Sequence, residues 1–179
     1  MPVIFIETPR LVIRQWEEKD YESYINLNAD PDVMEYFPSV KTPGETLAQV
    51  KRITEYIDQH GYGFWAVERK DNHQFIGFTG ICEPGFQTHF TPCIEIGWRL
   101  SKENWGQGFA TEAALASLDF GFEKLKLKKI YSFTSIHNHR SENVMQRIGM
   151  DKAGEFDHPL IADGHWLKKH VVYKIASNK

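Results

Sequence analysis

One short stretch, Gly106-Gln107-Gly108, constrains the fold of this chain most, because it separates two segments with different hydrophobic periods. Before it, residues 94–98 place apolar side chains at every second position, the pattern of a strand with one face on a core. After it, apolar side chains follow helical spacing at Ala110, Ala113, Ala114, Leu118 and Phe122. The stretch therefore predicts a strand, a glycine loop and a helix in succession.

The two glycines leave the loop backbone without Cβ atoms, so a ligand can approach the main chain closely. Amide groups at the start of a helix lack acceptors and carry partial positive charge, which favours an anion such as a phosphate. A nucleoside triphosphatase loop would need Lys after Gly108, and a dinucleotide loop would need glycine in place of Thr111; neither is present. The loop predicts either a plain tight turn or a pyrophosphate site of another kind.

The segment Trp105-Gly106-Gln107-Gly108-Phe109-Ala110 resembles the acyl-CoA loop of the GNAT superfamily of acetyltransferases, Arg/Gln-x-x-Gly-x-Gly/Ala, with Trp105 at the first position. Thr111-Glu112-Ala113 then resembles the branch that acetylates N-terminal amines of ribosomal proteins and related substrates. Further matches are Thr8-Pro9-Arg10-Leu11 with Arg14, Asn138-His139-Arg140-Ser141, and Ile148-Gly149-Met150. The resemblance covers about residues 7–175. It implies acetyl-CoA as co-substrate and, as acceptor, a primary amine on a protein N-terminus or a small molecule.

The resemblance also implies where acetyl-CoA would lie. Its pyrophosphate would rest between Trp105 and Thr111, on the amides of Gly106, Gln107, Gly108, Phe109 and Ala110. Its pantetheine arm would run along a strand that splays from the next one, beside Ile96, Gly97 and Trp98. The same family pattern assigns the pantetheine arm to Asn138, the thiol end to Asn143 and phosphates to Arg147.

Acetyl transfer to an amine needs a base, because an alkyl ammonium, with a pKa of about 8 to 10.4, cannot attack a thioester. Glu95 is the predicted base, since isoleucines on both sides can bury it and raise its pKa towards neutrality. A salt bridge or a solvent-facing position is the alternative. A backbone amide near Ile96 would stabilise the oxyanion. Ser141 either protonates the leaving thiolate, as the resemblance implies, or caps a helix. Transfer would be direct, in a ternary complex.

Capping signals, hydrophobic periods and turn residues predict the other elements. The predicted helices are 20–27 with Asp20 as cap, a short piece within 28–38, 42–61 with a capping box at Thr42 and Glu45, and 141–148 closed by Gly149. The predicted strands are 11–14, the hairpin 64–68 and 75–81, 129–135, 152–156 and 165–175. The fold class is therefore α/β, a single-domain GNAT fold with a mixed, mostly antiparallel central sheet, helices on both faces and a splayed central strand pair.

Two sets of apolar residues in the early helices receive specific predictions. The helix over 42–61 would bury one face, namely Leu47, Val50, Ile53 and Ile57. Four aromatic residues would line either the acceptor pocket or the core, namely Tyr21, Tyr24, Tyr36 and Phe37.

The chain of 179 residues is long enough for one domain, predicted over residues 1–179 with its core at about 7–175. A net charge of −3 gives no nucleic-acid footprint. No apolar run approaches the ~18 residues of a membrane span, so no membrane partner is expected. Residues 1–6 lack the basic start and full apolar region of a signal peptide, which predicts a cytoplasmic location.

The cysteines and histidines do not show the spacing of a disulfide framework or a metal site. Cys82 and Cys93 are predicted to be buried free thiols. His137 and His139 could form a metal pair, but no third ligand is spaced nearby, so no metal is expected. The sequence leaves the oligomeric state open and allows a homodimer, the commonest symmetric assembly.

Two other functions share these motifs. A non-catalytic CoA-binding sensor or subunit would keep the loop and the strand and lack an acceptor pocket. An antibiotic-modifying acetyltransferase would have a strongly acidic acceptor cleft. The acidic residues before the central strand allow this, namely Glu17, Glu18, Asp20, Glu22, Asp30, Asp32 and Glu35.

Overall fold

The computed structural model describes residues 3–177, so the first two residues of the N-terminal segment considered above lie outside the description. These residues form one eight-stranded sheet in the order β1-β2-β3-β4-β5-β6-β8-β7. The strands are β1 (Ile4–Glu7), β2 (Leu11–Arg14), β3 (Phe64–Arg69), β4 (Phe75–Cys82), β5 (Glu95–Leu100), β6 (Lys129–Ser135), β7 (Asp151–Asp157) and β8 (Lys169–Ala176). Neighbouring strands are antiparallel except β5 and β6, which confirms the predicted mixed, mostly antiparallel sheet.

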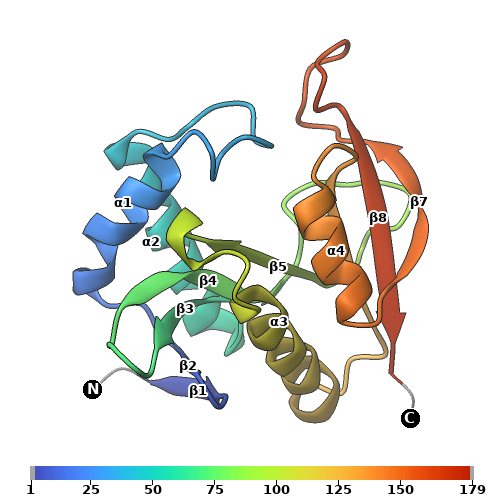
Figure 1. Cartoon of the computed structure of the whole chain (residues 1–179). Helices are drawn as coiled ribbons and strands as arrows, with labels where there is room; N and C mark the ends of the chain where they lie inside the picture. Colours follow the sequence, from blue (N-terminus) through green and yellow to red (C-terminus); the bar gives the residue numbers. More distant parts are fainter. Residues whose placement is uncertain (1–2, 178–179) are drawn as a thin grey trace.

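Helices cover both faces of this sheet, as Figure 1 shows. They are α1 (Tyr21–Ala29), α2 (Pro43–His60), α3 (Phe109–Asp119) and α4 (His139–Arg147). A π-helical turn, Phe120–Lys124, extends α3. Within residues 3–177 no helix is both long and apolar enough to cross a membrane.

The helix α2 begins at the predicted capping box. The Thr42 hydroxyl accepts from the Glu45 amide at 3.2 Å, and the Glu45 carboxylate accepts from the Thr42 amide at 2.7 Å. The helix ends at Gly61, whose φ of 76° is the left-handed conformation that glycine adopts without strain. One predicted core position is wrong, because Leu47 is 42% exposed and Thr46 takes the buried place.

Two predicted side-chain caps are wrong: Asp20 makes no capping bond to α1, and at α4 another residue takes the role. Asp20 precedes α1, but its carboxylate accepts from Arg14 and from the Glu17 amide instead of capping that helix. The cap of α4 is Asn138, whose Oδ1 accepts from the Ser141 amide at 3.2 Å. Ser141 is therefore the third residue of α4 and leaves the capping role to Asn138.

Two stretches that were predicted to be helix or strand form turns in the structure. Residues 28 and 29 are the end of α1, and residues 30–38 form turns instead of a further helical piece; the Asp30 side chain accepts from the Asp32 amide at 2.8 Å, a local bond that competes with helix formation. The last strand begins at Lys169 and not at His165, because residues 158–168 make local turn bonds, such as His165 N–H to the Ala162 carbonyl. The edge strand β1 was not predicted.

A buried ion network joins β2, β3 and the turn before α1. The Arg14 guanidinium is 1% exposed and donates to both Asp20 carboxylate oxygens, at 2.7 and 2.8 Å. Its Nε and Nη2 also donate to Glu68 Oε2, at 2.9 and 2.8 Å. Burial raises the pKa of Glu68, but the hydrogen bonds from Arg14 outweigh it and hold that pKa below its ordinary value. The network fixes the position of α1 against the sheet.

We expect Asp20→Ala to lower the free energy of unfolding by about 3–5 kcal/mol, because it leaves the buried Arg14 cation without its bidentate partner. Denaturant unfolding at pH 7 measures this loss. The matched control is Asp71→Ala, which removes an exposed carboxylate from its pair with Arg69 and should have little effect. Equal losses in the two variants would contradict the assignment.

The strands β5 and β6 separate almost as soon as they meet. Glu95 opposite Tyr131 is the one pairing between them within residues 3–177, and the Ser132 hydroxyl donates to the Ile96 carbonyl at 2.9 Å. The carbonyls of Ile94 and Ile96 both point towards β6. Because the backbone groups of every second residue in a strand point to the same side, the N–H and C=O of Trp98 also point towards β6. The splay that the resemblance implied is confirmed, and it leaves the Trp98 backbone facing a gap in the sheet.

Candidate active site

The glycine loop between β5 and α3 presents a row of unpaired amides. Gly106 and Gly108 have φ values of 72° and 81°, and α3 begins at Phe109. The first amide bonded along α3 is that of Glu112, which donates to the Gly108 carbonyl at 3.0 Å. Within residues 3–177 the six amides from Gly106 to Thr111 have no acceptor. Consecutive free N–H groups at a helix start form an anion site, and here they fit a phosphate group.

An unpredicted contact from the chain start holds this loop in shape. The Glu112 carboxylate accepts from the Thr8 hydroxyl at 2.6 Å and from the Arg10 Nε at 2.6 Å. Arg10 Nη1 in turn donates to the Gln107 carbonyl at 2.9 Å, and its guanidinium lies 4.4 Å from the centre of the Phe109 ring. Because the C=O and N–H of one peptide group point in opposite directions, this bond turns the Gly108 amide away from Arg10. Thr8, Arg10 and Glu112 therefore position the amides.

We expect Glu112→Gln to raise the Kd for CoA about 10-fold, because it removes the charge that holds Arg10 on the Gln107 carbonyl. Isothermal titration with CoA measures this change. The control is Glu103→Gln, a nearby acid whose carboxylate does not contact Arg10 and whose loss should leave the Kd unchanged. A Glu112→Gln protein with wild-type affinity would contradict the positioning role.

Glu95 lies at the start of β5, next to the point where β5 and β6 separate. Its Oε1 is 3.8 Å from the Cys82 sulfur, directly across on β4. Burial raises the pKa of Glu95 to about 8, against the opposing effect of the hydrogen bond from Cys82. The predicted direction of this pKa shift is confirmed, and a carboxylate with such a pKa can accept a proton from an amine above about pH 8.

The three strand residues predicted to lie beside pantetheine differ in their backbone surroundings. The Ile96 carbonyl is occupied by Ser132. A Cβ on Gly97 would come within 3.1 Å of the Phe64 ring, so this glycine is required by a neighbouring side chain. Trp98 alone of the three has backbone groups that face the gap between β5 and β6 without a strand partner in the described part of the chain.

The structure brings Asn138 and Ser141 together at the start of α4. Asn138 donates to the Thr134 hydroxyl at 3.0 Å and to the Ser141 hydroxyl at 3.2 Å, so both its amide hydrogens are used within the turn. Ser141 accepts this bond, and its own hydroxyl hydrogen has no acceptor within residues 3–177. Ser141 can therefore donate a proton, whereas Asn138 has only acceptor capacity left for a ligand.

Of the remaining residues predicted to bind the cofactor, two are exposed on α4, and Trp105 already uses its hydrogen-bond donor within the protein. Asn143 and Arg147 are exposed and share one face of α4, four residues apart. The indole N–H of Trp105, its one donor, is used on the Leu100 carbonyl at 2.8 Å. Arg140 lies 4.3 Å from the centre of the Trp105 ring. Trp105 thus contacts the start of α4 and has no donor for a phosphate.

The aromatic candidates for the acceptor pocket also divide. Tyr24 is fully buried in the core, and Tyr21 packs against that core. Tyr36 lies 6.2 Å from Trp166, ring to ring, on the segment between β7 and β8. Phe37 is partly exposed and covers the guanidinium of Arg99. Tyr36 and Phe37 therefore stay candidates for acceptor contact.

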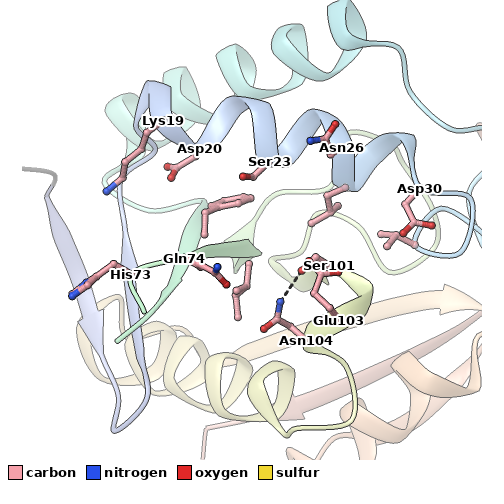
Figure 2. A pocket seen from close by; sticks show the side chains of 14 residues that line it. Lys19, Asp20, Ser23, Asn26, Asp30, His73, Gln74, Ser101, Glu103 and Asn104 are labelled. Atoms are coloured by element: carbon pink, nitrogen blue, oxygen red, sulfur yellow. Dashed lines mark hydrogen bonds between the residues drawn. The ribbon is translucent and has the colours of Figure 1, made fainter. Parts of the chain in front are cut away.

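A polar cavity of about 480 Å³ lies away from the candidate active site, between α1, the start of β4 and the turn after β5. Figure 2 shows Ser23 and Asn26 of α1 opposite Gln74 and the pair Ser101 and Asn104, which are joined by a hydrogen bond of 2.8 Å. Neither Glu95 nor the glycine loop lines this cavity. It is separate from the candidate active site.

No group of three or more His, Cys, Asp or Glu side chains within residues 3–177 is arranged to hold a metal ion. The His137 ring lies 5.4 Å from that of Trp166, and His139 Nδ1 is 3.6 Å from the Glu142 carboxylate. The two histidines therefore face different neighbours.

Comparison with known proteins gives a consistent result. Residues 10–151 match the family described as Acetyltransferase (GNAT) domain. The chain is 31% identical over 159 residues to the spermidine N(1)-acetyltransferase of Escherichia coli (strain K12), which covers 86% of this chain and 80% of that protein. It is 23% identical over 181 residues to the [ribosomal protein uS5]-alanine N-acetyltransferase of the same strain, covering 96% and 90%.

The fold comparison agrees with the family match. The crystal structure of an acetyltransferase (GNAT family) from Bacillus anthracis superposes with a TM-score of 0.79 at 30% identity, covering 97% of this chain and 98% of that one. The loop, the splayed strands and the family match therefore lead to one conclusion: the chain belongs to the GNAT family of acetyltransferases.

Proposed function

We propose that this protein transfers an acetyl group from acetyl-CoA to a primary amine by direct attack in a ternary complex. The observation that carries the proposal is the row of six unpaired amides from Gly106 to Thr111 beside a strand pair that splays at Glu95. The amides fit the pyrophosphate of CoA, and the gap after the splay fits its amide-bearing arm. The pyrophosphate then lies between Trp105 and Thr111, with the exposed Arg147 available to its phosphates and the exposed Asn143 to the thiol end.

The reaction needs a proton taken up and a proton given back. Glu95 removes a proton from the ammonium form of the acceptor, directly or through a water, and its pKa of about 8 is close to that of an α-amine. The amine nitrogen attacks the thioester carbonyl carbon, and a β5 amide near Ile96 stabilises the oxyanion. The carbon–sulfur bond then breaks, and the Ser141 hydroxyl protonates the CoA thiolate. The second proton of the attacking nitrogen leaves as the amide forms and restores the Ser141 hydroxyl, while Glu95 releases its proton to solvent.

Direct transfer is favoured over an acyl-enzyme because both nearby thiols are poor nucleophiles. Burial, with the Glu95 charge adding to it, raises the pKa of Cys93 to about 11, and the same causes raise that of Cys82 well above its ordinary value. Both thiols therefore stay protonated near pH 7, and only a thiolate attacks a thioester efficiently.

The antibiotic-modifying alternative loses the support of three of the seven early acidic residues. Asp20 is paired with Arg14, Asp32 with Lys102, and Glu35 with Arg140. These three carboxylates are neutralised within the protein, so they do not add to an acidic cleft for a polycationic acceptor.

Release of free thiol from acetyl-CoA, followed with a panel of primary amines, tests the proposal. We expect amine-dependent release, with one acetylated amine formed per thiol. Tight CoA binding with no release on any amine would favour the sensor alternative and contradict the enzyme. A cytoplasmic location and a homodimer stay predictions, and sedimentation at several concentrations tests the second.

A further inference from the structure

Arg99 on β5 is a partly accessible cation that has no carboxylate partner within residues 3–177. Its Nη1 donates to the Asn28 side-chain oxygen at 2.7 Å, and its guanidinium lies 4.1 Å from the centre of the Phe37 ring and 5.4 Å from that of Phe78. Its Nε is buried and has no acceptor within residues 3–177. Arg14, the other deeply placed arginine, has two carboxylates around it. The two sites therefore differ in kind.

An incompletely paired guanidinium is costly in a protein interior. Arginine keeps its proton in proteins, so it cannot escape the cost by becoming neutral. One neutral amide oxygen and two ring faces satisfy only part of its five donors. Burial accordingly lowers the pKa of Arg99, because no nearby carboxylate compensates for lost water. An anion from outside can complete a site of this kind, and a carboxylate matches the planar fork best.

Arg99 lies in line with the proposed catalytic base. Side chains two residues apart on a strand point to the same face, so Glu95, Gly97 and Arg99 share one face of β5. Their partners across the ladder agree: Cys82 contacts Glu95, and Phe78 contacts Arg99. Gly97, between the two charged residues, adds no side chain to this row; the Phe64 ring lies against it, 3.1 Å from where its Cβ would stand, so an acceptor that spans the row passes beside this ring.

The helices do not cover this row completely. Glu95, Gly97 and Arg99 are each partly accessible; on the opposite face of the same strand Trp98 is also partly accessible, whereas Ile96 and Leu100 are 1% and 4% exposed. Four residues along a strand span about 13 Å. A molecule with its amine at Glu95 therefore reaches Arg99 with a group on the order of 10 Å away.

We propose that Arg99 binds a carboxylate of the acceptor, so that the acceptor is an amine carrying a carboxylate on the order of 10 Å from the nitrogen that is acetylated. This inference rests on the proposed acetyl transfer and names its substrate class. An extended peptide of three residues has the required length, at about 3.3–3.6 Å per residue. A polyamine such as spermidine lacks the anion and is repelled by the Arg99 cation.

The test compares one acceptor in two forms. Tri-alanine with a free C-terminal carboxylate and the same peptide as its C-terminal amide have the same amine and the same length. We expect the wild-type protein to acetylate the acid with a kcat/KM about 10- to 100-fold higher than that of the amide, mostly through KM. Alanine itself, whose carboxylate is too close to its amine to reach Arg99, should gain no such advantage.

Variants locate this preference at Arg99. In Arg99→Met the ratio of acid to amide should fall to about one, and in Arg99→Lys, which keeps the charge but not the fork, it should recover in part. The ratio within one variant is unaffected by a general loss of folded protein. The control is Arg52→Met, an exposed arginine of α2, which should keep the wild-type ratio.

Each outcome is decisive. Equal use of acid and amide by the wild-type protein would overturn the inference while leaving acetyl transfer intact. A preference for the acid that persists in Arg99→Met would do the same, because Arg99 would then serve only to hold Phe37 in place. Thiol release with no amine at all would overturn the proposed function and this inference together.

Discussion

Glu95→Gln is expected to lower kcat/KM for amine acetylation by about 100- to 10,000-fold at pH 9, the usual contribution of general base catalysis. The buried carboxylate has a pKa of about 8, so it is protonated and inactive as a base below that pH and active above it. The wild-type to variant ratio should therefore rise as the pH is raised from 6.5 to 9. Taking this ratio on one acceptor cancels the titration of the amine itself.

The raised pKa of Glu95 also predicts how the stability of the folded protein changes with pH, which is a separate check on that pKa. A carboxyl whose pKa is raised by folding contributes stability below its ordinary pKa of about 4.3, and that contribution is lost as the pH rises through about 8. The melting temperature of the wild-type protein should fall relative to that of Glu95→Gln over this range. Glu83→Gln, at an exposed neighbouring site, is the control. A rate ratio independent of pH would remove Glu95 as the base.

Gly108→Ala should raise the Kd for acetyl-CoA about 100-fold or more. A side chain at φ 81° is strained, and its Cβ would lie 3.4 Å from Arg10 Nη2, so relief of strain turns the peptide groups on both sides. Loss of two charge-assisted hydrogen bonds from loop amides accounts for a change of that size. Isothermal titration measures the Kd directly.

Gly164→Ala is the matched control for this substitution. Gly164 has the same φ of 81°, lies far along the chain between β7 and β8, and has open space where a Cβ would stand. It therefore reproduces the backbone strain without touching the loop. Similar losses of CoA affinity in both variants would show that general destabilisation, and not the amide row, explains the effect.

The sequence predicted the parts of this site that depend on near neighbours in the chain. The change of period on either side of Gly106 predicted β5 and α3, and burial between two isoleucines predicted the raised pKa of Glu95. Thr42 and Glu45 predicted the start of α2 in the same way. In each case the physical cause lies within a few residues, so a single sequence contains it.

The parts that were missed depend on residues far apart in the chain. Glu112 holds Thr8 and Arg10 across more than 100 positions, and nothing in the local pattern announces that contact. Asp20 has the spacing of a helix cap, but the buried Arg14 competes for its carboxylate and wins through charge. Acceptor recognition at Arg99 likewise depends on which charges are absent around it, a property of the fold.

Thermal melting with acetyl-CoA, CoA, ATP and NAD, each added separately, tests the central claim most directly. The account predicts a clear rise in melting temperature with acetyl-CoA and CoA alone, because a ligand at ~100 times its Kd adds ~2.7 kcal/mol of stability. The amide row from Gly106 to Thr111 is the reason for this selectivity, together with the splayed strand beside it. No rise with either CoA compound, beside a rise with ATP or NAD, would contradict it.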